Sequence, residues 1–184
     1  MPKIKTTPEE IIKKSILVFR TKGYYRTSMN DLAIATGLTK GAFYHHFTNK
    51  EAVMKMSLQA TTKWFETKIF NIAYNENLNN KDRLKTMANI LFDAFTKNEG
   101  GCFFANTILE TAQVENTFVD EINSFFTLFE NALENIYQEK YSGEELKDVV
   151  IQTIATIEGT IVLMQLKNNS SLLRNSLNTI IINY

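Results

Sequence analysis

A short stretch of the chain carries side chains suited to contact with a polyanion. Residues 40 to 46 read Lys-Gly-Ala-Phe-Tyr-His-His, and Phe43 and Phe47, four positions apart, would share the buried face of a helix. The face left outside carries Lys40, Gly41, Ala42, Tyr44, His45 and His46. These offer a cation, two residues small enough for close approach to a base edge, and aromatic groups that form hydrogen bonds. The pattern indicates a helix that contacts DNA.

The residues before this stretch predict a second helix and a tight turn. Thr27 or Ser28 can cap the preceding helix, because a hydroxyl oxygen accepts one of the free N–H groups there. Gly37 stands where that helix would end with positive φ, which only glycine adopts without steric cost. Thr39 is the candidate N-cap of the next helix. A helix of about eight residues is ~12 Å long, close to the ~12 Å width of the B-DNA major groove. The sequence therefore predicts a helix-turn-helix.

Catalytic and metal-binding alternatives find little support in the residue pattern. His45 and His46 are adjacent, and neighbouring helix positions do not converge on one ion as an i, i+4 pair does. Cys102 would need a basic partner to act as a nucleophile, and both histidines lie in the predicted DNA-contacting segment. We therefore expect no catalytic residue, no metal and no cofactor, and we expect Cys102 to pack at the start of a helix.

A longer set of residues around this motif occurs in a familiar order. It comprises Gly23-Tyr24, Thr27-Ser28, Asp31-Leu32-Ala33, Ala35, Gly37-Leu38-Thr39-Lys40-Gly41, Tyr44, His46-Phe47 and Lys50-Glu51. Over roughly residues 8 to 55 the chain resembles the amino-terminal DNA-binding domain of the TetR family of bacterial transcriptional regulators. The resemblance implies DNA contacts from Thr27, Ser28, Thr39, Lys40, Gly41, Ala42, Tyr44, His45, His46 and Lys50. Thr27 or Ser28 would set a helix amino terminus against a phosphate, and His46 and Lys50 would contact backbone oxygens.

The charges are spread unevenly, although the formal net charge is zero. Residues 1 to 55 contain ten Lys or Arg and four Asp or Glu, a balance of +6, and the remainder carries −6. A basic head on an acidic body is typical of a polyanion-binding domain joined to one that does not bind polyanions. A single cysteine fits a reducing cytoplasm, and no apolar stretch approaches the ~18 residues of a membrane span. We expect a cytoplasmic protein without membrane association.

Helical periodicity covers the chain and predicts an all-α fold of about nine helices. The first helix begins with the capping box Thr7-Pro8-Glu9-Glu10, and Gly23 ends it. A later helix begins after Asn49 and runs to about residue 74, and five more segments follow at 81–97, 102–113, 117–140, 144–166 and 172–182. We expect a helix-turn-helix domain over residues 1–50 and an effector-binding and dimerisation domain over residues 51–184.

The second of these domains is rich in aromatic residues. Ten of the thirteen phenylalanines fall between residues 64 and 130, together with Trp64. For most of them, filling a core is the simpler interpretation. The family resemblance implies a pocket for a small ligand, and such pockets are lined mainly by apolar and aromatic side chains. The candidate lining residues are Trp64, Phe92, Phe95, Phe103, Asn106 and Phe126.

The last two helical segments carry apolar stripes that could belong to the core or to an interface. The stripes consist of Ile154, Ile157, Ile161 and Met164 in one segment and Leu173, Leu177 and Ile180 in the other. Ala155 and Gly159, four apart, would let another helix approach closely. The resemblance implies a homodimer joined by a bundle of two carboxy-terminal helices from each subunit, and a paired half-site also demands a two-fold dimer.

These patterns predict a sequence-specific DNA-binding transcriptional regulator. The expected mechanism is that of a repressor: a small molecule binds the body, tilts the helix that begins at Lys50 and releases the operator. The alternative is a ligand-independent adaptor whose body contacts a protein partner. The sequence leaves open the effector, the operator and the choice between repression and activation.

Overall fold

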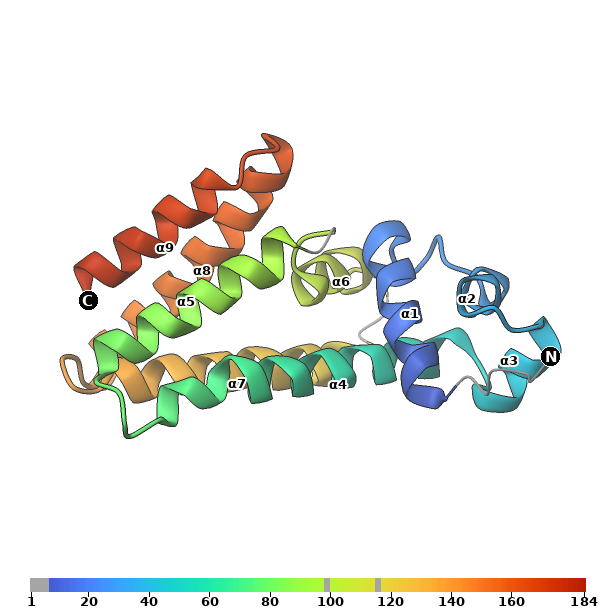
Figure 1. Cartoon of the computed structure of the whole chain (residues 1–184), viewed down its shortest axis with the longest axis horizontal. Helices are drawn as coiled ribbons and strands as arrows, with labels where there is room; N and C mark the ends of the chain where they lie inside the picture. Colours follow the sequence, from blue (N-terminus) through green and yellow to red (C-terminus); the bar gives the residue numbers. More distant parts are fainter. Residues whose placement is uncertain (1–6, 98–99, 115–116) are drawn as a thin grey trace. The chain divides into compact units, whose positions relative to one another are not determined.

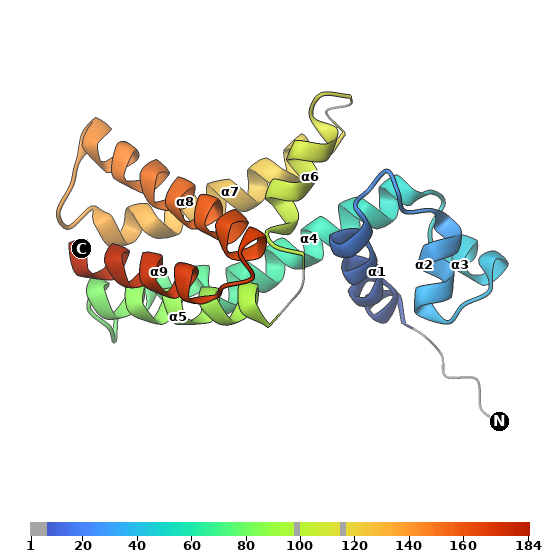
Figure 2. The same cartoon turned by 90° about the horizontal axis from the view of Figure 1, so that it is seen from above.

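The computed structural model describes residues 7–97, 100–114 and 117–184. Across these residues the chain forms nine α-helices and one short 3-10 helix, with no strand (Figures 1 and 2). The elements are α1 (Pro8–Lys22), α2 (Met29–Thr36), α3 (Lys40–His46), α4 (Lys50–Lys68), η1 (Phe70–Tyr74), α5 (Asn80–Thr96), α6 (Phe103–Thr111), α7 (Val119–Tyr137), α8 (Gly143–Leu166) and α9 (Ser171–Asn183). The predicted all-α fold of about nine helices is confirmed.

The chain forms two compact units. The first unit comprises residues 1–62 and 103–122, and the second comprises residues 63–102 and 123–184. Helix α4 contributes to both units, and α6 belongs to the same unit as α1 to α3. The functional division expected at residue 50 stays a prediction, because compact packing does not by itself assign function.

Helices α1 to α3 enclose a small apolar core in the first unit. Thr7 and Glu10 form the predicted capping box at the start of α1, where each side chain accepts a hydrogen bond from the other residue's backbone N–H. Helix α1 packs on α2, and α2 packs on α3. The buried apolar side chains of these helices are Ile11, Ile12, Phe19, Leu32, Ala33 and Phe43, joined by Phe47 just after α3. This core fixes the orientation of α3 relative to α2.

The helix expected to run from Lys50 to about residue 74 is shorter in the structure. It begins as predicted after Asn49, whose Oδ1 accepts a hydrogen bond of 2.8 Å from the Ala52 N–H. It ends at Lys68, and the chain continues as the 3-10 helix η1. The change of geometry buries Phe70, whose ring stacks on Phe129 with the centroids 5.1 Å apart. The single long helix was therefore a wrong prediction, because burial of Phe70 outweighs continuation of the α-helical turn.

Aromatic rings form the centre of the second unit. The Phe65 ring lies 5.1 Å from that of Phe125 and 6.0 Å from that of Phe95, and the Phe70 ring lies 5.6 Å from that of Phe125. All four side chains are buried. Ring pairs at these separations add to the stabilisation from burial alone, by ~0.5–1.5 kcal/mol each. For these residues, core filling is the role that the structure shows.

Helices α8 and α9 pack along each other, and α9 also packs on α5 (Figure 2). The expected dimer residues lie on this packed side. Ile154, Ile157, Ile161, Met164, Leu173 and Leu177 are buried within the chain, and Ile180 is half-buried. Their part in a dimer stays a prediction, but their packing contacts in this structure are made within one chain.

The opposite face of α8 is apolar and exposed. Its exposed residues recur at helical spacing as Ile151, Ala155, Gly159, Val162 and Leu166. With apolar residues on both faces, α8 has an 18-residue window with mean hydropathy 1.6, and by length and composition alone it could cross a membrane. This finding corrects the expectation that no apolar stretch approaches that length. One third of the window is buried inside the chain.

Candidate nucleic-acid interface

The amino terminus of α2 is held by a reciprocal cap. Ser28 Oγ accepts a hydrogen bond of 3.1 Å from the Asp31 N–H, and the Asp31 carboxylate accepts one of 2.9 Å from the Ser28 N–H. The Lys22 ammonium lies 2.7 Å from Asp31 Oδ1. Lys22 and the Ser28 donors together hold the pKa of the Asp31 carboxyl well below its usual value. Of the two predicted cap candidates, Ser28 therefore caps the helix.

The turn between α2 and α3 has the predicted geometry. Gly37 adopts φ 75° and ψ 17°, the left-handed conformation that glycine reaches without a steric penalty. Its N–H and that of Leu38 donate to carbonyl oxygens at the end of α2. Thr39 Oγ1 then accepts a hydrogen bond of 3.2 Å from the Ala42 N–H and caps α3. The turn and both caps are thus fixed by local contacts.

Most residues predicted to contact DNA are exposed on this element. Ser28, Thr39, Lys40, Gly41, Tyr44, His45 and His46 are exposed, and Ala42 is half-buried beside the buried Phe43. An added Cβ at Gly41 would meet no atom within 4 Å. The Lys40 ammonium lies 6.0 Å from the centroid of the Tyr44 ring. The structure therefore places these residues on α3, on its cap Thr39 and on Ser28, the cap of α2.

Two of the predicted contact residues are engaged inside the chain. Thr27 is 2% exposed, and its hydroxyl donates to the Gly23 carbonyl oxygen at 2.6 Å. The half-buried Lys50 donates to the Tyr24 carbonyl oxygen at 2.8 Å, and its ammonium lies 4.2 Å from the centroid of the Tyr24 ring. Burial lowers the pKa of the Lys50 ammonium, and the nearby Glu110 carboxylate partly offsets this effect.

Sequence reasoning missed Glu110, which is a partner of the same segment. Its carboxylate accepts hydrogen bonds of 2.8 Å from the backbone N–H groups of both Tyr24 and Tyr25. No local pattern could have shown this, because the partners lie 85 and 86 positions apart in the sequence. The residue is an ordinary glutamate on a short apolar helix when the sequence is considered alone.

The residues proposed for a ligand pocket are divided between the two units. Trp64, Phe92, Phe95 and Phe126 belong to the second unit, and Phe103 and Asn106 belong to the first. Trp64 is 44% exposed, with its ring 5.1 Å from that of Phe65, whereas Phe95 and Phe103 are buried. The Phe92 ring lies under the Arg174 guanidinium, at 3.5 Å from the centroid. Their role in binding a ligand remains a prediction.

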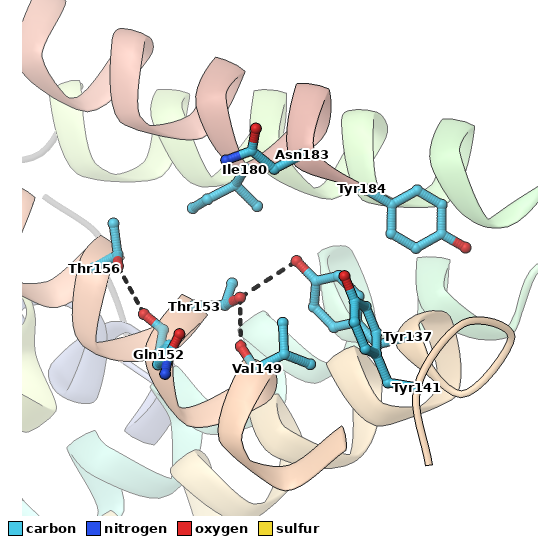
Figure 3. Close-up of a pocket in the computed structure, with 9 residues that line it drawn as sticks. All are labelled: Tyr137, Tyr141, Val149, Gln152, Thr153, Thr156, Ile180, Asn183 and Tyr184. Carbon is cyan, nitrogen blue, oxygen red and sulfur yellow. Dashed lines mark hydrogen bonds between the residues drawn. The ribbon is translucent and has the colours of Figure 1, made fainter. Parts of the chain in front are cut away.

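A cavity of about 170 Å³ lies elsewhere in the second unit (Figure 3). It is lined by Tyr137, Tyr141, Val149, Gln152, Thr153, Thr156, Ile180, Asn183 and Tyr184. The Tyr137 hydroxyl lies 3.3 Å from Thr153 Oγ1, which itself donates to the Val149 carbonyl oxygen at 2.7 Å. Burial raises the pKa of Tyr137. None of the predicted pocket residues lines this cavity.

Cys102 is buried and lies directly before the first residue of α6, so it packs at the start of a helix as the sequence predicted. Its thiol is hydrogen-bonded to the Glu158 carboxyl, whose pKa is raised by burial. Over residues 7–97, 100–114 and 117–184, no group of three His, Cys, Asp or Glu side chains could hold a metal ion.

This arrangement defines a helix-turn-helix DNA-binding protein with an α-helical body. Residues 11–55 match the family described as bacterial regulatory proteins, tetR family. Residues 81–178, more than half of the chain, match the family described as transcriptional regulator LmrA/YxaF-like, C-terminal domain. The chain belongs to the TetR family and is a DNA-binding transcriptional regulator rather than an enzyme.

Individual relatives agree with this assignment. The chain is 31% identical over 131 residues to the uncharacterised HTH-type transcriptional regulator YerO of Bacillus subtilis (strain 168), in a match covering 68% of this chain and 45% of that relative. It is 22% identical over 167 residues to the HTH-type transcriptional repressor DhaR of Mycobacterium sp. (strain GP1), in a match covering 88% of this chain and 83% of that relative. The crystal structure of a TetR regulator from Legionella pneumophila superposes with a TM-score of 0.86, at 19% identity and 97% coverage of each chain, which shows a shared fold.

Proposed function

We propose that this regulator is a homodimeric repressor that a small molecule releases from a palindromic operator. The exposed face of α3 is the observation that carries the proposal. It combines the Lys40 cation with the uncrowded backbone of Gly41 and the hydrogen-bonding side chains of Tyr44 and His45. These features suit insertion into a major groove, where base edges are read by close backbone approach and side-chain hydrogen bonds.

Contacts to phosphates would come from the ends of the helices. The exposed Ser28 hydroxyl stands at the amino terminus of α2, where free N–H groups and the helix dipole favour an anion. Thr39 stands in the same way at the amino terminus of α3, whereas His46, at the other end of α3, would contact a phosphate through its side chain alone. We keep Thr27 and Lys50 in this interface as supports: they fix the carbonyl groups of Gly23 and Tyr24 next to the α2 cap.

The dimer interface is proposed on the exposed face of α8. Ile151, Val162 and Leu166 are 54%, 56% and 77% exposed, and the small residues Ala155 and Gly159 lie between them. An exposed apolar stripe of this length marks an association surface, and small residues let a second helix approach closely. The buried stripe predicted from the sequence would then support this interface from inside the chain.

A repressor role is supported by the relative DhaR, which is named a repressor. The effector site is proposed in the aromatic part of the body near Trp64 and Phe126, with the cavity beside Tyr137 and Thr153 as the competing location. An apolar or aromatic compound would fit the first site. A small compound with hydrogen-bonding groups would fit the second. Acting on DNA in a bacterial cell, the protein would work in the cytoplasm.

The test begins with selection of an operator from random-sequence DNA by the wild-type chain. A Lys40→Ala, Tyr44→Ala double variant should stay folded and dimeric but lose affinity for that operator by about a hundredfold at matched salt, because a base or phosphate contact contributes ~1–3 kcal/mol. Unchanged affinity would refute the assignment of α3.

The effector is tested by a thermal-shift screen of apolar and aromatic compounds, since a ligand that binds the folded state raises the unfolding midpoint. A stabilising compound should also change the fluorescence of Trp64, the only tryptophan, and release the operator. If Thr153→Val abolishes the stabilisation by the compound and Phe126→Ala does not, the effector site is the cavity beside Tyr137 and Thr153. A stabilising compound that leaves operator affinity unchanged would contradict the proposed release mechanism.

A further inference from the structure

The side chain of Glu110, on α6, is bound to the turn that connects α1 and α2. Its Oε2 accepts a hydrogen bond of 2.8 Å from the Tyr24 N–H, and its Oε1 accepts one of 2.8 Å from the Tyr25 N–H. Both carboxylate oxygens are therefore used by two consecutive backbone groups, all within the first unit. Hydrogen bonds to an ionised acceptor are about twice as strong as neutral ones, so this contact holds the turn firmly.

Glycine at position 23 makes the contact possible. A Cβ added to Gly23 would lie 2.7 Å from Glu110 Oε2 and 2.9 Å from Oε1, closer than real Cβ contacts occur. Gly23 also adopts φ 80°, which other residues rarely adopt. The backbone of the turn and the carboxylate thus approach as closely as the absence of a side chain allows.

Other residues of the first unit hold the remaining groups of the turn. Lys50 of α4 donates to the Tyr24 carbonyl oxygen, and the Tyr24 ring meets the Phe118 ring edge-on with the centroids 4.8 Å apart. Thr27 donates to the Gly23 carbonyl oxygen and immediately precedes Ser28, the cap of α2. The start of α2 is therefore positioned by a turn whose donors and acceptors are tied to α4 and α6.

We propose that Glu110 is a positioning residue for DNA recognition, which sets the α1–α2 turn and, through it, the amino terminus of α2 and the Lys50 side chain. This inference rests on the proposed DNA contacts of α2 and α3. Glu110 itself does not touch DNA. It acts through the Tyr24 and Tyr25 amides, and a displacement of the α2 terminus by a fraction of an ångström misaligns the phosphate contacts that set the register of α3.

Two variants separate this role from a general contribution to folding. In Glu110→Gln one side-chain oxygen still accepts a hydrogen bond, whereas Glu110→Ala leaves no acceptor. Both should fold, because the contact between Glu110 and the Tyr25 amide is exposed and water can replace the carboxylate there. Glu145→Gln makes the same change of charge at an exposed position of α8 and is the matched control. Each full-length chain is assayed on the selected operator and on scrambled DNA of equal length, and amide hydrogen exchange is followed at residues 24 and 25.

We expect Glu110→Ala to lower operator affinity by about tenfold, as for loss of a charge-assisted hydrogen bond, with exchange at Tyr24 and Tyr25 accelerated by about the same factor. Affinity for scrambled DNA should fall less, because misplaced phosphate contacts weaken binding to any sequence, whereas the lost register of α3 weakens only the operator complex. The operator affinity of Glu110→Gln should lie between that of Glu110→Ala and that of the wild type. The operator affinity of Glu145→Gln should equal that of the wild type. Wild-type operator affinity in Glu110→Ala would overturn the inference, as would equal losses on both DNAs with a lowered unfolding midpoint. A wild-type chain that prefers no sequence would instead overturn the proposed function itself.

Discussion

The Lys50 ammonium donates a hydrogen bond of 2.8 Å to the Tyr24 carbonyl oxygen and lies 4.2 Å from the centroid of the Tyr24 ring. A lysine at the start of α4 is thereby used to hold the backbone turn that precedes α2. The contact gives Lys50 a structural role that can be separated experimentally from a direct phosphate contact.

Lys50→Met should destabilise the fold by ~1–2 kcal/mol, because the Tyr24 carbonyl loses its charged donor and the ring loses its cation. Lys40→Met is the matched change at an exposed position of α3, and it should alter stability by less than ~0.5 kcal/mol. Urea unfolding measures both effects. The assignment of roles would be wrong if Lys40→Met proved the more destabilising of the two.

Gly23→Ala should be more damaging than Gly37→Ala. Both glycines have positive φ, 80° and 75°, so each alanine carries a backbone penalty of ~1 kcal/mol or more. Only the Cβ at position 23 would collide with a neighbour, the Glu110 carboxylate; nothing lies within 4 Å of position 37. Thermal unfolding should show the larger loss for Gly23→Ala, and equal losses would argue against a close contact with Glu110.

Asp31→Asn should destabilise the protein in a pH-dependent way. Lys22 and Ser28 lower the pKa of the Asp31 carboxyl in the folded state. The stability that the ionised carboxylate contributes is therefore present above its unfolded pKa, ~3.9, and is lost as the pH falls toward the lower folded value. The difference in unfolding midpoint between wild type and variant should be largest near neutral pH and shrink below about pH 4. A difference that grows in acid would contradict the role of this ion pair.

Local signals in the sequence were sufficient to predict the helix-turn-helix. The cap at Ser28, the positive φ of Gly37 and the cap at Thr39 each depend on residues a few positions apart, and all three are found in the structure. Contacts between distant segments could not be predicted in this way. Glu110 and Tyr24 are 86 positions apart, and the end of α4 at Lys68 depends on burial of Phe70 among rings from other helices.

The two faces of α8 show a related limit. Periodicity identifies apolar stripes on a helix, but it does not say which stripe meets the same chain and which is left for a second copy. The sequence favoured the stripe around Ile157, which is buried, whereas Val162 and Leu166 are exposed. The three-dimensional packing of α8 on α9 supplies the missing information.

The proposed dimer interface can be tested with Gly159→Leu. Residue 159 is exposed on α8, and an added Cβ meets nothing within 4 Å, so the monomer has room for the substitution. Leucine also has a higher helix propensity than glycine, by ~0.8 kcal/mol. If a second α8 packs there, the variant should be largely monomeric by sedimentation at concentrations where the wild type is a dimer. An unchanged dimer would place the interface elsewhere.

Gly41→Leu tests the DNA-reading role of α3 most directly. Position 41 is exposed with open space around it, and leucine favours the helix, so the unfolding midpoint should stay the same or rise. The measurement is the ratio of affinities for the selected operator and for scrambled DNA at fixed salt. A side chain that blocks close approach to the bases should reduce this ratio by about tenfold to a hundredfold, through loss of operator affinity alone. An unchanged ratio in a folded, dimeric Gly41→Leu variant would contradict the account of α3 as the element that reads the operator.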